Sequence, residues 1–199
     1  MSPTATLFIG LTGSLGAGKS TALAAFEQLG AAVLDSDKVI HDLYDTEVVK
    51  TAVHLRWGDD VFTGDAVDRA AVARIVFDSA DQRAWLEGFL WPLSAQRADA
   101  FKASLETREP APRAGVVEVP LLFEADAASR FDVTIAIVAS DSLRAQRLAL
   151  RDQAELAARE QRQLPQEEKA SRATYTVVNE GTVAELEQEL AAILDNLAV

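Results

Sequence analysis

The segment from Gly13 to Thr21 constrains the fold of this chain more than any other part of the sequence. It reads G-S-L-G-A-G-K-S-T, which matches the pattern G-x-x-x-x-G-K-S at every position. In such a loop the glycines let successive backbone N–H groups point at phosphate oxygens, the lysine reaches the β and γ phosphates, and the serine hydroxyl ligates Mg²⁺. The pattern therefore predicts a nucleotide-phosphate site in which Lys19 binds phosphate and Ser20 binds the metal ion.

The sequence on either side of this loop supports the prediction. Residues 6–12 form a continuous apolar run typical of a buried parallel strand, and residues 19–29 have helical spacing. A phosphate bound between them would lie at the N-terminus of the helix, where unpaired N–H groups favour negative charge. The alternative, a glycine-rich turn that matches by chance, does not explain this setting.

Further apolar runs alternate with helical segments along the chain. After the first predicted strand these runs span residues 31–35, 115–119, 132–138 and 175–178. Such alternation predicts an α/β fold with a five-stranded parallel sheet flanked by helices, and a ligand site at the carboxyl ends of the strands. An amphipathic helix over residues 183–197 is predicted to cover the sheet.

The part of the chain between the second and third predicted strands is helical in pattern. Segments 38–50, 51–56, 68–77 and 81–107 are predicted helices, and Asp68 is expected to cap the third of them. Pro92 predicts a kink or break near Trp91. The aromatic residues of this part are interpreted as core, although they could also line a pocket. We therefore expect a core of residues 5–50, 113–142 and 172–199, interrupted by a helical insertion at about 51–112.

Two carboxylates follow the second predicted strand, at the same sheet edge as the phosphate loop. Asp35 and Asp37 flank Ser36 in a predicted strand-to-helix turn. One carboxylate could cap the helix while the other faces a reacting phosphate, or both could serve only as caps and turn formers. His41 and His54 have no second ligand at metal spacing, so we interpret them as structural residues.

Arginines gather late in the chain. The cations of this region are Arg144, Arg147, Arg151, Arg159, Arg162 and Lys169. The planar fork of arginine matches phosphate bidentately and stacks on adenine, so these residues indicate a helical flap that closes over a nucleotide. A solvated helical face with mixed charges is the alternative.

The overall charge limits the kinds of partner. The chain carries 19 basic and 31 acidic residues, a net charge of −12, which argues against non-specific binding to nucleic acid or to an anionic membrane. It has no cysteine, so disulfides and thiolate metal sites are excluded. The first residues do not resemble a signal peptide, and no run is apolar for long enough to span a membrane. We expect a soluble cytoplasmic protein.

A phosphate loop alone does not define a reaction, but the helical insertion and the flap favour a small-molecule kinase. At the level of motifs, the chain resembles the dephospho-CoA kinase family. The resemblance runs from about residue 7 to residue 197 and is carried by these segments: Gly10–Gly13, Gly16–Thr21, Asp35–Asp37, Gly64–Arg69, Pro120–Glu124, Gln146–Leu148, Arg159–Gln163 and Asn179–Gly181.

The resemblance implies a P-loop fold of the adenylate-kinase type and ATP-dependent phosphorylation of the ribose 3′-hydroxyl of dephospho-CoA, with Mg²⁺. It also implies that the insertion at about 51–112 is a helical substrate domain and that residues at about 143–171 form a lid. It implies Asp37 as the base, assisted by Lys19, Arg144 and Arg147. The residues that would bind ATP are Gly13, Leu15, Gly16, Ala17, Gly18, Lys19, Ser20, Thr21 and Asn179. The residues that would bind the acceptor are Asp35, Asp37, Arg69, Leu121, Phe123 and Glu124.

The chain departs from the family pattern at three positions. Trp91 stands where the family has His before Pro, Thr174 stands where it has Asp after Ala, and Ser36 replaces Ala between the two carboxylates. Two other functions remain open from the residues: another P-loop nucleoside or nucleotide kinase, and a regulatory protein that binds ATP without transfer. We expect a monomer or weak homo-oligomer.

Overall fold

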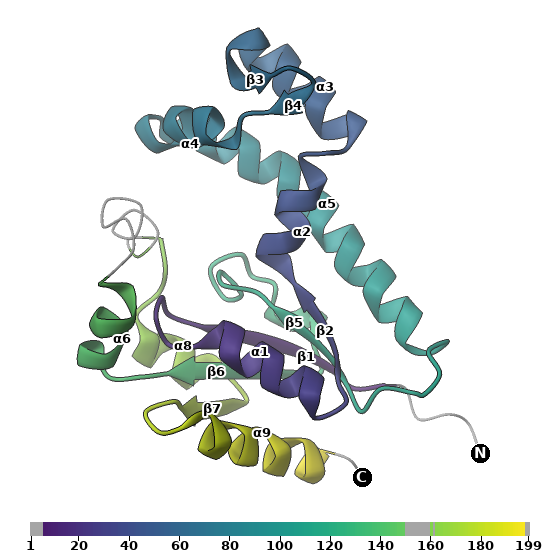
Figure 1. The fold of residues 1–199 in the computed structure, drawn as a ribbon, viewed down its shortest axis with the longest axis vertical. Helices are drawn as coiled ribbons and strands as arrows, with labels where there is room; N and C mark the ends of the chain where they lie inside the picture. The colour runs from purple at the N-terminus through teal and green to yellow at the C-terminus, as the bar shows by residue number, and fades with distance from the viewer. Residues whose placement is uncertain (1–5, 150–159, 161, 198–199) are drawn as a thin grey trace. The chain divides into compact units, whose positions relative to one another are not determined.

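A computed structural model describes residues 6–149, 160 and 162–197 (Figure 1). The chain divides into two compact units. The first comprises residues 1–35 and 101–199, and the second comprises residues 36–100.

The first unit is built on the predicted five-stranded parallel sheet, which the structure confirms. Its strands, in spatial order, are β2 (Ala32–Asp35), β5 (Gly115–Glu118), β1 (Phe8–Gly13), β6 (Val133–Val138) and β7 (Tyr175–Val178). All four pairings are parallel. The carboxyl ends of β1, β2 and β5 therefore lie at one edge of the sheet, and the phosphate loop leaves β1 at that edge.

Successive side chains of the central strands point to opposite faces of the sheet, and each face has its own apolar cluster. Ile9 and Val116 belong to one cluster, whereas their neighbours Phe8 and Val117 belong to the other. Because both faces of the sheet are covered, the central strands are mostly apolar, and this allowed their prediction from the sequence.

Helices of the first unit cover these faces. On one face α1 (Lys19–Gln28) packs beside α9 (Val183–Leu197), which buries Phe26 and Leu190 (Figure 1). The opposite cluster includes Phe101 and Leu105, from the last turns of α5 (Ala80–Leu105). The remaining described helices are α6 (Asp141–Leu148), α8 (Gln166–Arg172) and the 3₁₀ turn η2 (Ala128–Arg130).

The second unit is mostly helical and has a separate core. It contains α2 (Ser36–Leu43), α3 (Glu47–Trp57), the 3₁₀ turn η1 (Gly58–Val61), α4 (Arg69–Asp78) and α5 as far as Ala100. Leu43, Val49, Val53, Val72 and Leu90 are among its buried residues.

Several local predictions for this unit needed correction. The predicted helix over 38–50 is two helices, because the chain turns at Tyr44–Thr46, where the Thr46 hydroxyl donates a 2.6 Å hydrogen bond to the Leu43 carbonyl. A short antiparallel hairpin of β3 (Phe62–Thr63) and β4 (Ala66–Val67) lies between η1 and α4, and no strand was predicted there. Asp68 caps α4 as predicted, through bonds of 2.9 and 3.1 Å from the N–H groups of Ala70 and Ala71.

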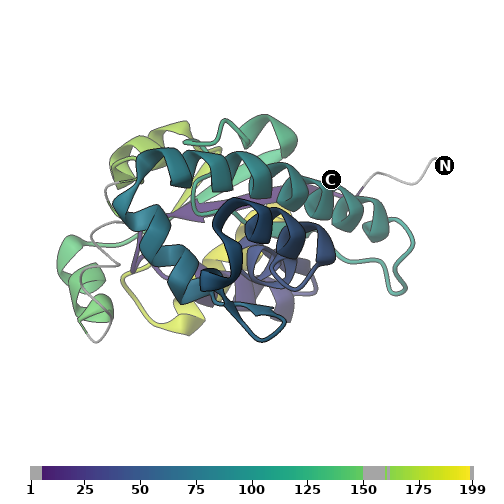
Figure 2. The ribbon, with the colours of Figure 1, turned by 90° about the horizontal axis from the view of Figure 1, so that it is seen from above.

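Of the kink or break predicted near Trp91, the break is wrong, because α5 is one continuous helix (Figures 1 and 2) that contains Pro92. A proline removes one helical hydrogen bond. Apolar residues on both sides of it, Phe89, Leu90 and Leu93, pack into the core of the second unit and hold the helix together.

The unit boundaries also differ from the predicted domain limits of 51 and 112. The second unit begins at Ser36, since Val39 and Ile40 of α2 pack into its core, and it ends at Ala100, since Phe101 packs on the sheet. The functional labels of substrate domain and lid stay predictions.

Candidate active site

The phosphate loop has a backbone that only glycine adopts without strain at several positions. Gly13, Gly16 and Gly18 have φ angles of 151°, 75° and 100°. A Cβ atom at Gly13 would lie 2.4 Å from the Ile137 carbonyl oxygen, and one at Gly18 would lie 2.1 Å from Asn179 Nδ2. The glycines therefore allow both the turn and the close approach of β6 and of the segment after β7.

The loop leads directly into α1, as predicted. Gly18 is the N-cap of α1, and Lys19, Ser20 and Thr21 form its first turn. The first N–H groups of an α-helix have no partner within the helix itself, and this setting suits an anion. Lys19 is buried, and its Nζ donates a 3.2 Å hydrogen bond to the Ser14 carbonyl, so its stem is packed against the loop that it serves.

The hydroxyl-bearing side chain of Ser20 is exposed at this helix start. Mg²⁺ prefers oxygen ligands, keeps several waters and commonly takes only one or two protein ligands beside substrate phosphates. Among residues 6–149, 160 and 162–197 no group of three or more Asp, Glu, His or Cys side chains could form an all-protein cage. A single Ser20 ligand fits the behaviour of Mg²⁺.

Arg147 and Asn179 converge on the carbonyls of the loop. Arg147 Nη1 donates to the carbonyls of Gly16 and Ala17 at 3.1 and 3.2 Å, and Nη2 donates to the Asn179 carbonyl at 3.1 Å. The buried Asn179 side chain donates to the Ala17 carbonyl at 2.8 Å. These bonds satisfy carbonyls of Gly16 and Ala17 with protein donors and fix the course of the loop.

Arg144 reaches the same loop from the preceding turn of α6. Its Nε donates to the Leu15 carbonyl at 2.9 Å, Nη1 to Asp141 at 2.9 Å and Nη2 to Glu160 at 2.7 Å. Only 13% of its side chain is exposed. Of the predicted flap arginines, Arg151 and Arg159 lie outside the residues that the structure describes.

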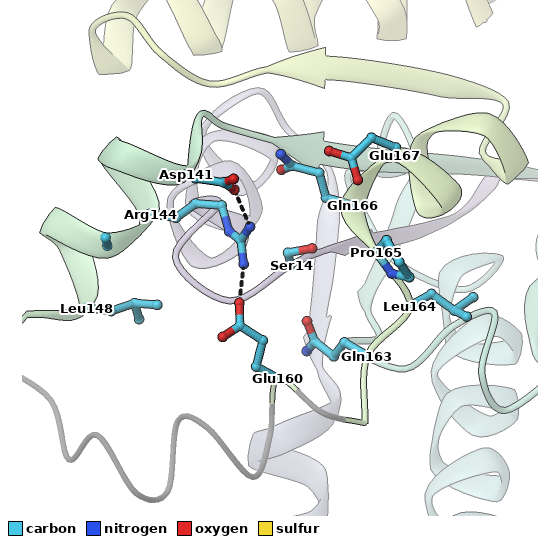
Figure 3. A pocket seen from close by; sticks show the side chains of 11 residues that line it. Ser14, Asp141, Arg144, Leu148, Glu160, Gln163, Leu164, Pro165, Gln166 and Glu167 are labelled. Carbon is cyan, nitrogen blue, oxygen red and sulfur yellow. Dashed lines mark hydrogen bonds and ion pairs between the residues drawn. The ribbon is translucent and has the colours of Figure 1, made fainter.

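A cavity of about 640 Å³ lies beside the phosphate loop (Figure 3). Figure 3 shows Arg144 between Asp141 and Glu160, with Ser14 behind it and Gln163 and Gln166 across the cavity. Its wall contains Leu148, Leu164 and Pro165 as well as polar groups, so it offers both apolar surface and hydrogen-bond partners. Such a mixed lining suits a small organic ligand.

The predicted acceptor residues Leu121, Phe123 and Glu124 lie in the turn after β5. Each is partly buried. Glu124 Oε1 accepts a 2.7 Å hydrogen bond from the Leu164 backbone N–H and lies 2.9 Å from Lys169 Nζ. This carboxylate is therefore tied to the cavity wall.

Two carboxylates, Asp35 and Glu118, lie at the ends of the neighbouring strands β2 and β5. Asp35, the last residue of β2, is in register with Glu118 of β5, which in turn is in register with Leu11 of β1. Glu118 is buried. The sequence left its role unassigned, and the structure places it beside Asp35 at the ligand edge of the sheet.

The other predicted acceptor residues, Asp37 and Arg69, belong to the second unit. Asp37 is exposed in the first turn of α2, and Arg69, the first residue of α4, hydrogen-bonds to His41 Nδ1. Asp37 and His41 are four positions apart on α2, so they share one face of that helix. The same unit buries Tyr44, and this burial raises the pKa of its phenol although the neighbouring Arg69 opposes the shift.

Thr174, one of the departures from the family pattern, has a structural role. Its hydroxyl accepts a 3.1 Å hydrogen bond from the Thr134 N–H, and its own N–H donates to the Thr134 hydroxyl at 3.0 Å. These reciprocal bonds join the starts of β6 and β7. Trp91 is 41% exposed on α5.

Two residues of these contact networks were missed as site candidates. His41 was interpreted as structural, but it contacts a predicted substrate residue. Lys169 was noted only as one of several cations, yet it is fully buried against Glu124. The Glu124 contact joins residues 45 positions apart, and local spacing does not signal such a pairing.

A family model and curated relatives agree on the family of the chain. A sequence model of dephospho-CoA kinase matches residues 7–185. Dephospho-CoA kinase from Helicobacter pylori J99 is 33% identical over 194 residues, covering 95% of this chain and 96% of the relative. Dephospho-CoA kinase from Geobacter metallireducens is 35% identical over 192 residues and covers 94% of each chain.

Among solved structures, the crystal structure of TT1252 from Thermus thermophilus superimposes with a TM-score of 0.83. It is 32% identical and covers 98% of this chain and 100% of its own. Across the described residues, no helix is both long and apolar enough to cross a membrane.

Proposed function

Because the chain belongs to the dephospho-CoA kinase family, its reaction is phosphoryl transfer from ATP to the ribose 3′-hydroxyl of dephospho-CoA, and we propose how its residues divide this task. The products are coenzyme A and ADP. The observation that carries the proposal is the geometry of the phosphate loop. Arg144, Arg147 and Asn179 donate hydrogen bonds to its carbonyls, and its last residues form the first turn of α1.

ATP is the phosphoryl donor, and its phosphates bind the backbone N–H groups from Gly13 to Thr21. Lys19 supplies a buried positive charge for the β and γ phosphates, and Ser20 ligates Mg²⁺ together with water. Phosphoryl transfer depends mainly on positioning and charge neutralisation, which this loop provides. The cavity lined by Ser14, Arg144 and Gln163 receives the rest of the nucleotide.

Arg144 and Arg147 neutralise charge on the transferring group. In the described structure both guanidinium groups bind carbonyls of the loop, so each stands next to the phosphate site. Arg147 also keeps the loop in shape through Asn179. We also propose that the segment of residues 143–171 acts as a lid over the nucleotide.

The acceptor is bound by Asp35, Asp37, Arg69, Leu121, Phe123 and Glu124. Asp37 follows the ligand edge of the sheet by two residues and orients the 3′-hydroxyl, whose proton it accepts late in transfer. The contact of Arg69 with His41, one turn beyond Asp37, supports a common acceptor surface on α2. We further propose a cytoplasmic location and a monomer or weak homo-oligomer that does not bind nucleic acid.

Steady-state assays test the reaction and the base separately. The protein is incubated with ATP, Mg²⁺ and one acceptor at a time from dephospho-CoA, nucleosides and nucleoside monophosphates. We expect ADP release with dephospho-CoA, and turnover of another acceptor alone would overturn the assignment.

The variant Asp37→Asn is then compared with Asp42→Asn, which removes an exposed carboxylate elsewhere on α2. We expect Asp37→Asn to lower kcat by about 10²–10⁴ at unchanged ATP affinity, the usual range for a general base. Full activity of Asp37→Asn would refute the base role.

A further inference from the structure

Lys169 is a fully buried lysine in α8, outside the phosphate loop and its arginines. Its Nζ donates a 2.6 Å hydrogen bond to the Pro120 carbonyl and lies 2.9 Å from Glu124 Oε1. A buried ammonium group is costly unless it is paired and hydrogen-bonded. Both of these contacts lie in the turn after β5, so Lys169 fixes α8 to that turn.

The partner carboxylate has asymmetric surroundings. Glu124 Oε1 accepts from Lys169 and from the Leu164 N–H, whereas Oε2 is buried without a hydrogen-bond partner in the described part of the chain. Lys169 therefore places a positive charge beside a carboxylate that has only one paired oxygen. Burial lowers the pKa of Lys169, and Glu124 opposes this shift by favouring the charged ammonium.

These contacts connect three parts of the nucleotide side of the molecule. The Pro120 carbonyl also accepts a 3.4 Å hydrogen bond from the hydroxyl of Thr12, the residue before the phosphate loop. Leu164 and the three residues after it line the cavity beside Arg144. One ammonium group thus joins the turn after β5, the end of β1 and the cavity wall.

We propose that Lys169 is a positioning residue for the nucleotide, acting through Glu124 on the wall formed by residues 163–167. The proposal rests on the proposed function, in which this cavity receives part of ATP. When Lys169 holds Glu124 in place, the carboxylate fixes the Leu164 N–H and with it the wall. When the ammonium is lost, Glu124 loses its ion pair while its second oxygen stays buried and unpaired, so the carboxylate shifts and the wall shifts with it.

The test compares Lys169→Met with Arg172→Gln. Arg172 lies on the same helix, but its ion pair with Glu168 is exposed, so its loss controls for a general effect on α8. For each variant, KM for ATP, KM for dephospho-CoA and kcat are measured in the full chain. We expect Lys169→Met to raise KM for ATP about tenfold or more, which corresponds to about 1.4 kcal/mol. KM for dephospho-CoA should rise less than KM for ATP, because Glu124 also belongs to the proposed acceptor site. The kcat should stay within about threefold, and Arg172→Gln should resemble wild type.

The double variant Glu124→Gln with Lys169→Met keeps the inference testable if the single variant folds poorly. It removes the unpaired charge but retains an oxygen for the Leu164 N–H, so we expect it to recover most of the lost ATP affinity. Equal increases in both KM values, or an unchanged KM for ATP in a folded variant, would overturn the positioning role. Failure of the wild type to phosphorylate dephospho-CoA would instead refute the proposed function.

Discussion

The side-chain amide of Asn179 donates a 2.8 Å hydrogen bond to the carbonyl of Ala17, which lies 162 positions earlier in the sequence. The neighbouring residue, Gly18, has no side chain and a φ of 100°, so the amide can approach the loop. The segment after the last strand therefore contacts the phosphate loop, although it is far away in the sequence. This contact supports the proposal that Asn179 belongs with the nucleotide-binding residues.

Replacing Gly18 by alanine should damage this arrangement. The added Cβ would lie 2.1 Å from Asn179 Nδ2 at a backbone angle that alanine rarely adopts. We expect ATP affinity to fall at least about tenfold, since the loop must shift to relieve the clash. Titration calorimetry with ATP and Mg²⁺ measures this change. Gly88→Ala is the control, because nothing lies within 4 Å of its added Cβ on α5, and unchanged affinity in Gly18→Ala would contradict the proposed loop geometry.

Arg147→Lys should weaken nucleotide binding although it retains the positive charge. Arg147 donates to three carbonyls from the two ends of its guanidinium group, and an ammonium group does not reproduce that planar fork. We expect KM for ATP to rise by about tenfold, on the order of one lost charge-assisted hydrogen bond. Arg113→Lys, which alters an exposed pair with Asp195, provides the matched control. An Arg147→Lys variant with wild-type kinetics would show that charge alone is sufficient.

Periodicity predicted the sheet because its central strands β1, β5 and β6 are mostly apolar on both faces, and a chain in which such runs alternate with helices has few other ways to bury them. The phosphate loop could also be predicted from the sequence, since Gly13, Gly18 and Lys19 lie within seven positions of one another. Local rules also identified Asp68 as a helix cap. These features depend on neighbours in the sequence.

The features that the sequence did not reveal depend on distant partners. The turn at Tyr44–Thr46 is set by packing of Tyr44 and Leu43 into the core of the second unit, and α5 passes through Pro92 because that core holds both sides of it. Lys169 meets Pro120 across 49 positions. Spacing within a helix or strand carries no information about such contacts, so the buried pair appeared only in the structure.

Lys19→Ala should abolish most of the phosphoryl transfer. Lys19 is the buried cation of the phosphate loop, and its Nζ also bonds to the Ser14 carbonyl. Removing one preorganised electrostatic contact from a developing charge commonly costs about 10² or more in kcat. ADP release with dephospho-CoA as acceptor measures the loss, with Lys50→Ala as control because Lys50 pairs with Glu47 in the second unit. A rate close to that of wild type would contradict the role of the loop.

The start of α9 provides a prediction about stability and pH. Thr182 and Glu185 form a capping box in which Glu185 Oε2 accepts from the Thr182 N–H at 2.7 Å, and the Thr182 hydroxyl accepts from the Glu185 N–H at 3.2 Å. The hydrogen bonds from the backbone N–H and the hydroxyl of Thr182 lower the pKa of the Glu185 carboxyl. The ionised form is therefore favoured in the folded state.

The stabilisation from this ionised carboxylate should be present above the unfolded pKa of glutamate, about 4.3, and should be lost as the pH falls through the lower folded pKa. We expect wild type to be more stable than Glu185→Gln at pH 7, with a difference that shrinks as the pH falls from about 5 to about 3. Urea unfolding of both proteins across this range measures the difference. Glu189→Gln, which alters an exposed carboxylate further along α9, should track wild type, and a difference that stays constant with pH would show that Glu185 acts by its shape and not by its charge.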